Sequence, residues 1–62
     1  PMDYIIHYRI KIATILLKNT SKSITDIAFE VGFSSSSYFT IAFKKITGLT
    51  PSEYKKHTSV SL

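Results

Sequence analysis

The polar side chains between residues 36 and 45 are those whose types and spacing best suit contact with a ligand. A helix turns by about 100° per residue, so a helix through this segment places Ser37, Thr40, Ile41 and Lys44 opposite Phe39 and Phe43, with Ser36 and Lys45 at the flanks. Hydroxyl groups can bond to base edges or phosphates, an aliphatic side chain can touch a thymine methyl, and lysines suit phosphate. DNA binding and an ordinary solvated helix face both fit this spacing. The residues concerned are Ser36, Ser37, Thr40, Ile41, Lys44 and Lys45.

Catalytic and metal-binding chemistry finds little support in the remaining residues. The 62-residue chain has no Cys, and therefore no thiol nucleophile, disulfide or Cys-based metal site. So short a chain also has no core large enough to orient a Ser-His-acid triad. His7 and His57 lack partners at metal-ligand spacing, and Gly32 and Gly48 are too far apart for a phosphate-cradling loop. We therefore expect a non-enzymatic domain that needs no cofactor or metal.

The charge balance favours an anionic partner. Eight Lys and Arg against four Asp and Glu give a net charge of +4. Residues 1–40 contribute +1 of this excess and residues 41–62 contribute +3. A polyanion such as nucleic acid is therefore the first partner to consider. No signal-peptide pattern opens the chain, and its apolar stretches are too short for a membrane span.

Capping signals divide the chain into four expected helices and predict an all-α fold. Ser23 followed by Asp26 makes a variant capping box, and either Ser34 or Ser35 can cap the third helix. Gly32 and Gly48 suit left-handed helix ends. The run Thr50-Pro51-Ser52-Glu53 combines an N-cap, Pro at the first helical position and an acid at the third. The expected helices span 3–18, 24–31, 36–47 and 51–57, and residues 58–62 are expected to form a frayed tail.

The second and third of these helices have the pattern of a helix-turn-helix. Their apolar stripes face one another, Gly32 permits a sharp turn, and Phe33 is expected to fill the corner between them. Two helices joined in this way can present the second to a major groove of DNA. Residues 34–37 are four consecutive serines, and a short flexible linker remains the alternative there. The two stripes are Ile24, Ile27, Ala28 and Val31, then Phe39, Ala42, Phe43 and Ile46.

The first helix is apolar over most of its circumference, more than a surface helix needs. One stripe, Ile6, Ile10, Ala13 and Leu17, suits the core. A further stripe consists of Tyr4, Tyr8, Ile12 and Ile15. Either a partner covers this second stripe or the tyrosines expose only their hydroxyl ends. The repeat of Pro-x-acid-Tyr at residues 1–4 and 51–54 favours a missing partner, namely a preceding unit of the same kind.

Arg9 lies at the apolar edge of the same helix. It could contact a phosphate, or it could be partly buried with its head group paired to Asp26 or Glu30. The second interpretation is favoured because Arg9 shares its face with core residues.

The motif of residues 24–54 resembles the DNA-binding signature of the AraC/XylS transcription regulators. The resemblance rests on Ile24-Thr25-Asp26-Ile27-Ala28-Phe29-Glu30-Val31-Gly32-Phe33, on Ser37-Tyr38-Phe39-Thr40 with Phe43-Lys44-Lys45, and on Gly48-Leu49-Thr50-Pro51-Ser52-Glu53-Tyr54. Tyr4, Arg9, Ala13 and Leu16-Leu17 extend it upstream, so that it covers residues 1–56.

The resemblance implies the second of two helix-turn-helix units in a bacterial, cytoplasmic regulator, associated with the nucleoid when bound to DNA. Residues 1–19 would be the connecting helix, 23–47 the helix-turn-helix and 50–57 the last helix. The first unit and a sensor domain would lie elsewhere. Base contacts would come from Ser36, Ser37, Tyr38, Thr40 and Ile41. Backbone contacts would come from Lys22, Ile24, Thr25, Lys44, Lys45 and Lys55.

Ile41 departs from the family pattern, because Arg is common at this position. Because this departure removes a charged contact, we expect a unit that docks on the DNA backbone and reads few bases. The competing interpretation is a protein-interaction module that docks through the first helix, and self-association through Tyr4, Tyr8, Ile12 and Ile15 would be one form of it. A helix lying on a membrane surface is a third and weaker alternative. Salt dependence separates them, because only DNA binding should collapse with added salt.

Overall fold

The computed structural model describes residues 4–58, which form four helices and no strand. These are α1 (Tyr4–Asn19), α2 (Ile24–Glu30), α3 (Ser36–Thr47) and α4 (Pro51–Thr58). The all-α prediction is thus confirmed, and the helix boundaries from Asn19 to Thr58 lie within one residue of their expected places. Thr58 was expected to begin a frayed tail at 58–62 and is instead the last residue of α4. The expected helix start at Asp3 and the rest of that tail lie outside the described residues.

The helix starts are fixed by side-chain caps. Ser23 Oγ accepts a hydrogen bond from the Asp26 amide at 3.0 Å, and Ser35 Oγ accepts one from the Tyr38 amide at 3.1 Å. Such caps satisfy amides that have no partner within the helix. Ser35, rather than Ser34, is therefore the cap of α3, and the serine run is a structured turn followed by a helix rather than a linker.

The start of α4 is a reciprocal capping box. Thr50 Oγ1 accepts from the Glu53 amide at 3.1 Å, and Glu53 Oε1 accepts from the Thr50 amide at 2.9 Å. The hydrogen bond from the Thr50 backbone lowers the pKa of the Glu53 carboxyl, because that bond favours the charged form. The expected box over residues 50–53 is confirmed.

The end of α2 is a Schellman motif built on Gly32. The Phe33 amide donates to the Ala28 carbonyl at 3.0 Å, and the Gly32 amide donates to the Phe29 carbonyl at 3.1 Å. This closure requires a left-handed residue, and Gly32 has φ +105. The predicted left-handed conformation of Gly32 is confirmed. α2 ends one residue earlier than expected because Val31 is its C-cap.

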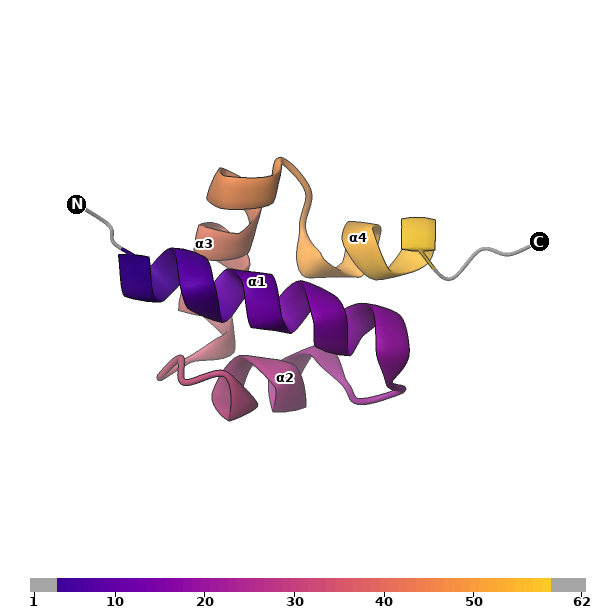
Figure 1. Ribbon diagram of the computed structural model, residues 1–62, viewed down its shortest axis with the longest axis horizontal. Coiled ribbons are helices and arrows are strands. Elements are labelled where there is room, and N and C mark those ends of the chain that lie inside the picture. Colours follow the sequence, from indigo (N-terminus) through magenta and orange to yellow (C-terminus); the bar gives the residue numbers. More distant parts are fainter. Residues whose placement is uncertain (1–3, 59–62) are drawn as a thin grey trace.

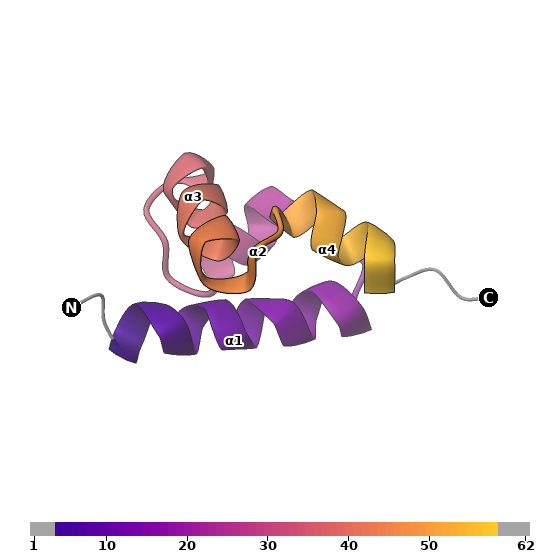
Figure 2. The ribbon, with the colours of Figure 1, turned by 90° about the horizontal axis from the view of Figure 1, so that it is seen from above.

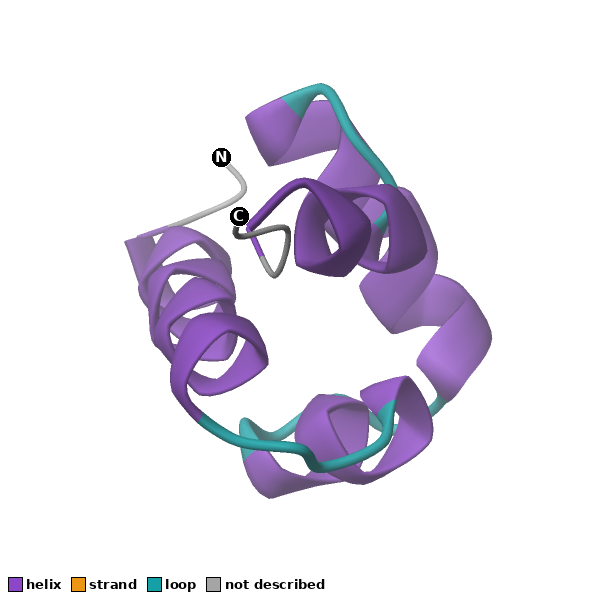
Figure 3. Cartoon of the chain, turned by 90° about the vertical axis from the view of Figure 1, so that its right-hand side faces the viewer, coloured by secondary structure: helices purple, strands orange, loops and turns teal. Residues whose placement is uncertain are grey.

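The helices form two layers, with α1 on one side and α2, α3 and α4 on the other (Figure 2). In Figure 1, α3 begins behind α1 and rises above it, α4 lies above the line of α1 and α2 lies below it; α1 packs against all three. Only helices and loops occur in the described chain (Figure 3). The core between the layers consists of Ile10, Ala13, Leu17, Ile27, Ala28, Phe33, Phe39, Ala42 and Phe43. Both expected inward stripes contribute to it, with Ile24, Val31 and Ile46 partly buried at its margin.

The second stripe of α1 faces away from this core. Tyr4 is 80% exposed and Tyr8 54%, and their rings stack with centroids 6.5 Å apart. Much more than the hydroxyl ends of the tyrosines is therefore accessible. An open groove of about 340 Å³ lies beside the stripe, between α1 and the end of α2; it is lined by Tyr8, Arg9, Ile12, Leu16, Glu30 and Val31. Between residues 4 and 58, no helix has both the length and the apolar character to cross a bilayer.

Candidate nucleic-acid interface

The outer face of α3 has the polar composition predicted from the sequence. Phe39 and Phe43 are fully buried, and α3 turns Ser37, Ile41 and Lys44 outward, where all three are exposed. Ile41 is aliphatic but 64% exposed, and it is not part of the hydrophobic core. This face is accessible along the length of α3.

Ser36 and Thr40 lie closer to the body of the protein than their neighbours do. Both are half-buried, and Thr40 Oγ1 donates to the Ser36 carbonyl at 2.9 Å within the helix. That bond occupies the hydroxyl hydrogen of Thr40, and its oxygen keeps the capacity to accept. These two residues therefore form the inner margin of the face, whereas Ser37 and Ile41 form its centre.

Tyr38 is both a structural and a surface residue. Its ring packs edge-on against the buried Phe33, with centroids 5.4 Å apart, while 45% of the residue remains exposed. Tyr38 is thus anchored through its ring at the start of α3 and remains partly accessible there.

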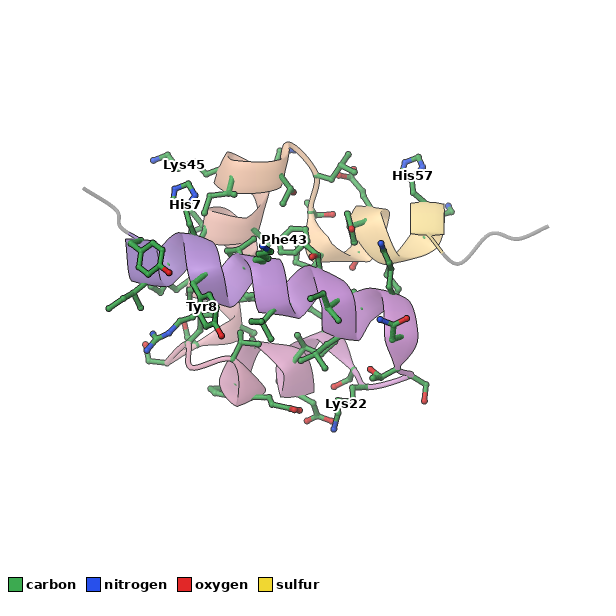
Figure 4. The ribbon with its side chains drawn as sticks, viewed as in Figure 1. His7, Tyr8, Lys22, Phe43, Lys45 and His57 are labelled. Atoms are coloured by element: carbon green, nitrogen blue, oxygen red, sulfur yellow. The ribbon has the colours of Figure 1, made fainter. Side chains whose placement is uncertain are left out.

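Lys44 and Lys45 are exposed in the last turn of α3. Figure 4 shows Lys45 extending outward from the α3 side of the molecule. Cations at a helix C-terminus interact favourably with the helix dipole, and neither side chain forms an ion pair among the described residues. Both ammonium groups are therefore available to an anionic ligand.

The other predicted backbone contacts form a second group at the start of α2. Lys22 lies at the opposite edge of the molecule from Lys45 (Figure 4). Its ammonium is 3.2 Å from the Glu30 carboxylate, and the Lys55 ammonium donates to the Lys22 carbonyl at 3.2 Å. The structure thus brings Lys22 and Lys55 together next to Ile24 and Thr25, which open α2. Sequence spacing did not reveal that Lys22 has an acidic partner.

The hydrogen-bond partner of Arg9 is not the one favoured from the sequence. Its guanidinium does not pair with Asp26 or Glu30; instead, Nη1 donates to the Gly32 carbonyl at 3.1 Å. Glu30 forms an ion pair with Lys22 instead. The guanidinium can approach Gly32 closely because Gly32 has no side chain. The expected ion pair is wrong, and the expected partial burial of Arg9 is confirmed.

Phe29 and the two histidines are exposed outside these groups of residues. Phe29 is 53% exposed on α2 and was not singled out from the sequence, although its place off the Ile27–Ala28 stripe was a signal. His7 and His57 are both exposed (Figure 4), and no group of three or more potential metal ligands occurs in the described part of the chain.

Comparison with known proteins agrees with this architecture. A family model described as "Helix-turn-helix domain" matches residues 1–57. The chain is 33% identical over 60 residues to a putative AraC-like transcription regulator of Streptomyces lividans, covering 97% of the chain and 20% of that protein. It is 46% identical over 56 residues to the HTH-type transcriptional regulator ExsA of Pseudomonas aeruginosa, covering 90% of the chain and 20% of that regulator.

A third relative is the melibiose operon regulatory protein of Escherichia coli K12, which is 47% identical over 54 residues, covering 87% of the chain and 18% of that protein. The chain therefore spans about a fifth of the length of the regulators that it matches. No solved structure matches it. The fold, the capped turn and these similarities together show that the chain belongs to the AraC/XylS-type family of helix-turn-helix transcription regulators.

Proposed function

We propose that this domain binds double-stranded DNA by inserting α3 into a major groove, as the second helix-turn-helix of a longer transcription regulator. One observation carries the proposal: α3 buries Phe39 and Phe43 completely while it exposes Ser37, Ile41 and Lys44 on the opposite face. A helix held by its core side and polar on its outer side is the arrangement by which helix-turn-helix proteins read DNA. In this proposal α1 is the helix that connects to the preceding unit.

The proposed DNA contacts fall into two classes, those to base edges and those to the phosphate backbone. Ser37 and Ile41 would reach base edges, with Ser36, Tyr38 and Thr40 at the margin. Lys44 and Lys45 would bind phosphates on one side of the groove. Lys22, Lys55 and the first amides of α2, at Ile24 and Thr25, would bind the backbone on the other side. Two short side chains at the centre of α3 supply few hydrogen bonds, so we expect mostly non-specific affinity.

The proposed function predicts a steep salt dependence. Four lysines near phosphates correspond to a log–log slope of roughly −3 to −4, because each contact releases condensed counterions. Affinity for a mixed-sequence duplex should therefore fall about 100-fold between about 50 and 200 mM salt. Fluorescence anisotropy of a labelled duplex measures this directly. Affinity that is independent of salt, or no binding at low salt, would overturn the proposal.

Ile41 should control affinity without supporting the fold. Ile41→Arg adds a cation and a bidentate donor to the exposed face, so we expect tighter DNA binding by about 1–3 kcal/mol. Ser37→Ala, Thr40→Ala and Ile41→Ala should each change the free energy of unfolding by less than about 0.5 kcal/mol. Lys18→Arg at the end of α1 is the control, since it exchanges one cation for another away from α3. Unchanged affinity for Ile41→Arg would place Ile41 outside the interface.

The second candidate function is docking through α1, favoured by the exposure of Tyr4, Tyr8 and Ile15. Burying about 400 Å² of this surface is worth about 10 kcal/mol before association costs, which leaves roughly micromolar affinity. We therefore expect the 62-residue chain to self-associate through α1. Sedimentation equilibrium at rising concentration tests this, with Tyr8→Lys as the variant expected to restore the monomer. A wild-type chain that stays monomeric up to about 1 mM has too little affinity for this interpretation.

A further inference from the structure

We propose that Arg9 is a positioning residue for DNA recognition: its hydrogen bond to Gly32 fixes the turn from which α3 projects and so sets the angle between α3 and α1. The consequence for DNA binding rests on the proposed function, whereas the consequence for the helix angle does not. Arg9 lies in α1, outside the helix-turn-helix itself, and Gly32 follows it by 23 residues.

The contact acts on a single peptide group. The Gly32 carbonyl accepts from Arg9 Nη1 at 3.1 Å, and the amide of the next residue, Phe33, donates to the Ala28 carbonyl at 3.0 Å. These two groups belong to the same planar peptide unit. One edge of that plane is therefore bonded to α1 and the other to α2, which fixes its orientation relative to both helices.

The same peptide leads directly into α3. The Phe33 side chain is buried, and its ring lies 5.3 Å from that of Phe39 and 5.4 Å from that of Tyr38, centroid to centroid. Both partners are in the first turn of α3. A rotation of the Gly32–Phe33 peptide would therefore move the aromatic ring on which α3 begins, so the bond from Arg9 connects α1 to the position of α3.

Gly32 provides the space that this contact needs. A Cβ atom on Gly32 would lie 2.9 Å from Arg9 Cζ and 3.0 Å from Arg9 Nε. Gly48 has a similar left-handed conformation, with φ +88, but nothing lies within 4 Å of its corresponding position. Gly32 is therefore packed closely against an arginine, whereas Gly48 is not. Because both glycines end a helix in the left-handed conformation, the helix end alone does not explain this packing.

A direct phosphate contact by Arg9 is the alternative, and the two roles differ in salt dependence. A phosphate contact contributes about 0.9 to the log–log slope, whereas a positioning residue contributes nothing to it. A loss of affinity at unchanged slope therefore identifies positioning. Stability alone cannot separate these roles, because removal of a hydrogen bond lowers it in either case.

The test compares Arg9→Met, Arg9→Lys and the control Lys11→Met in the 62-residue chain. Lys11 is an exposed cation in the same helix, so its replacement removes the same charge without the contact to the turn. Anisotropy with a mixed-sequence duplex gives affinity and salt slope, and residual dipolar couplings give the angle between α1 and α3. We expect Arg9→Met to change this angle and to weaken binding about three- to thirtyfold at unchanged slope.

Arg9→Lys keeps a donor of similar reach and should recover most of the affinity, and Lys11→Met should lose less than about twofold. An unchanged helix angle in folded Arg9→Met would overturn the proposal, and so would a slope reduced by about one unit. If Arg9→Met does not fold, Arg9→Gln, which also removes the guanidinium, is tested by the same criteria. If the wild-type chain binds no DNA, the proposed function fails, and the helix angle alone decides the role of Arg9.

Discussion

Phe43→Ala should lower the free energy of unfolding by about 3–5 kcal/mol, the largest effect that we expect from one substitution. Phe43 is fully buried, and its ring lies 5.6 Å from that of Phe39 and 5.5 Å from that of Tyr54. It therefore joins α3 to α4 in the centre of the core (Figure 4). A domain of this size has a total stability of only about 3–9 kcal/mol, so the variant should be largely unfolded at 37 °C.

Urea denaturation followed by circular dichroism measures this loss. Ile41→Ala is the matched control, because it removes an aliphatic side chain from the same helix at a position that is 64% exposed. We expect the control to remain within about 0.5 kcal/mol of the wild type. If the two variants lost similar stability, the inward and outward faces of α3 would be assigned incorrectly.

Gly32→Val should cost about 2–3 kcal/mol of stability through two separate effects. A β-branched residue is strained at φ +105, which accounts for about 1–2 kcal/mol. The new side chain would also displace the Arg9 guanidinium, since a Cβ would lie 2.9 Å from Arg9 Cζ. Losing that hydrogen bond accounts for about 1 kcal/mol more.

Gly48→Val separates these effects. It has the strain of φ +88 but meets no atom within 4 Å, so its cost should be smaller by the value of the Arg9 contact. Thermal or urea unfolding of the two variants gives the difference. A cost below about 1 kcal/mol for Gly32→Val is incompatible with a left-handed Gly32 in solution.

The helices and their caps were predictable because their signals are local. Ser23, Gly48 and the Thr50–Glu53 box each act within four residues of their own position, and the apolar stripes of α2 and α3 follow from helical periodicity. The choice between Ser34 and Ser35 was not predictable, since both fit the same cap and differ only in where the chain enters α3. The end of α2 differed by one residue because Val31 is the C-cap, and residue type does not distinguish a C-cap valine from the last residue of a helix.

The partners of long charged side chains were not predictable from spacing. Arg9 bonds to a backbone carbonyl 23 residues away, and Lys55 bonds to the carbonyl of Lys22, 33 residues away. Every residue has a backbone carbonyl, so residue types do not reveal which carbonyl accepts a hydrogen bond. For Arg9 the sequence therefore suggested only the carboxylates of Asp26 and Glu30. The partial burial of Ser36 and Thr40 likewise depends on how α3 packs against the other helices, which helical periodicity does not determine.

Insertion of α3 into a major groove is tested most directly by titrating the isotope-labelled domain with a mixed-sequence DNA duplex and following the amide chemical shifts. We expect the largest changes at Ser37, Ile41 and Lys44 on the outer face of α3, with smaller ones at Ile24 and Thr25. Tyr8 and Ile15 on α1 should not change at the concentrations used. Changes confined to the exposed face of α1, with α3 unaffected, would contradict DNA binding through α3 and favour docking through α1 instead.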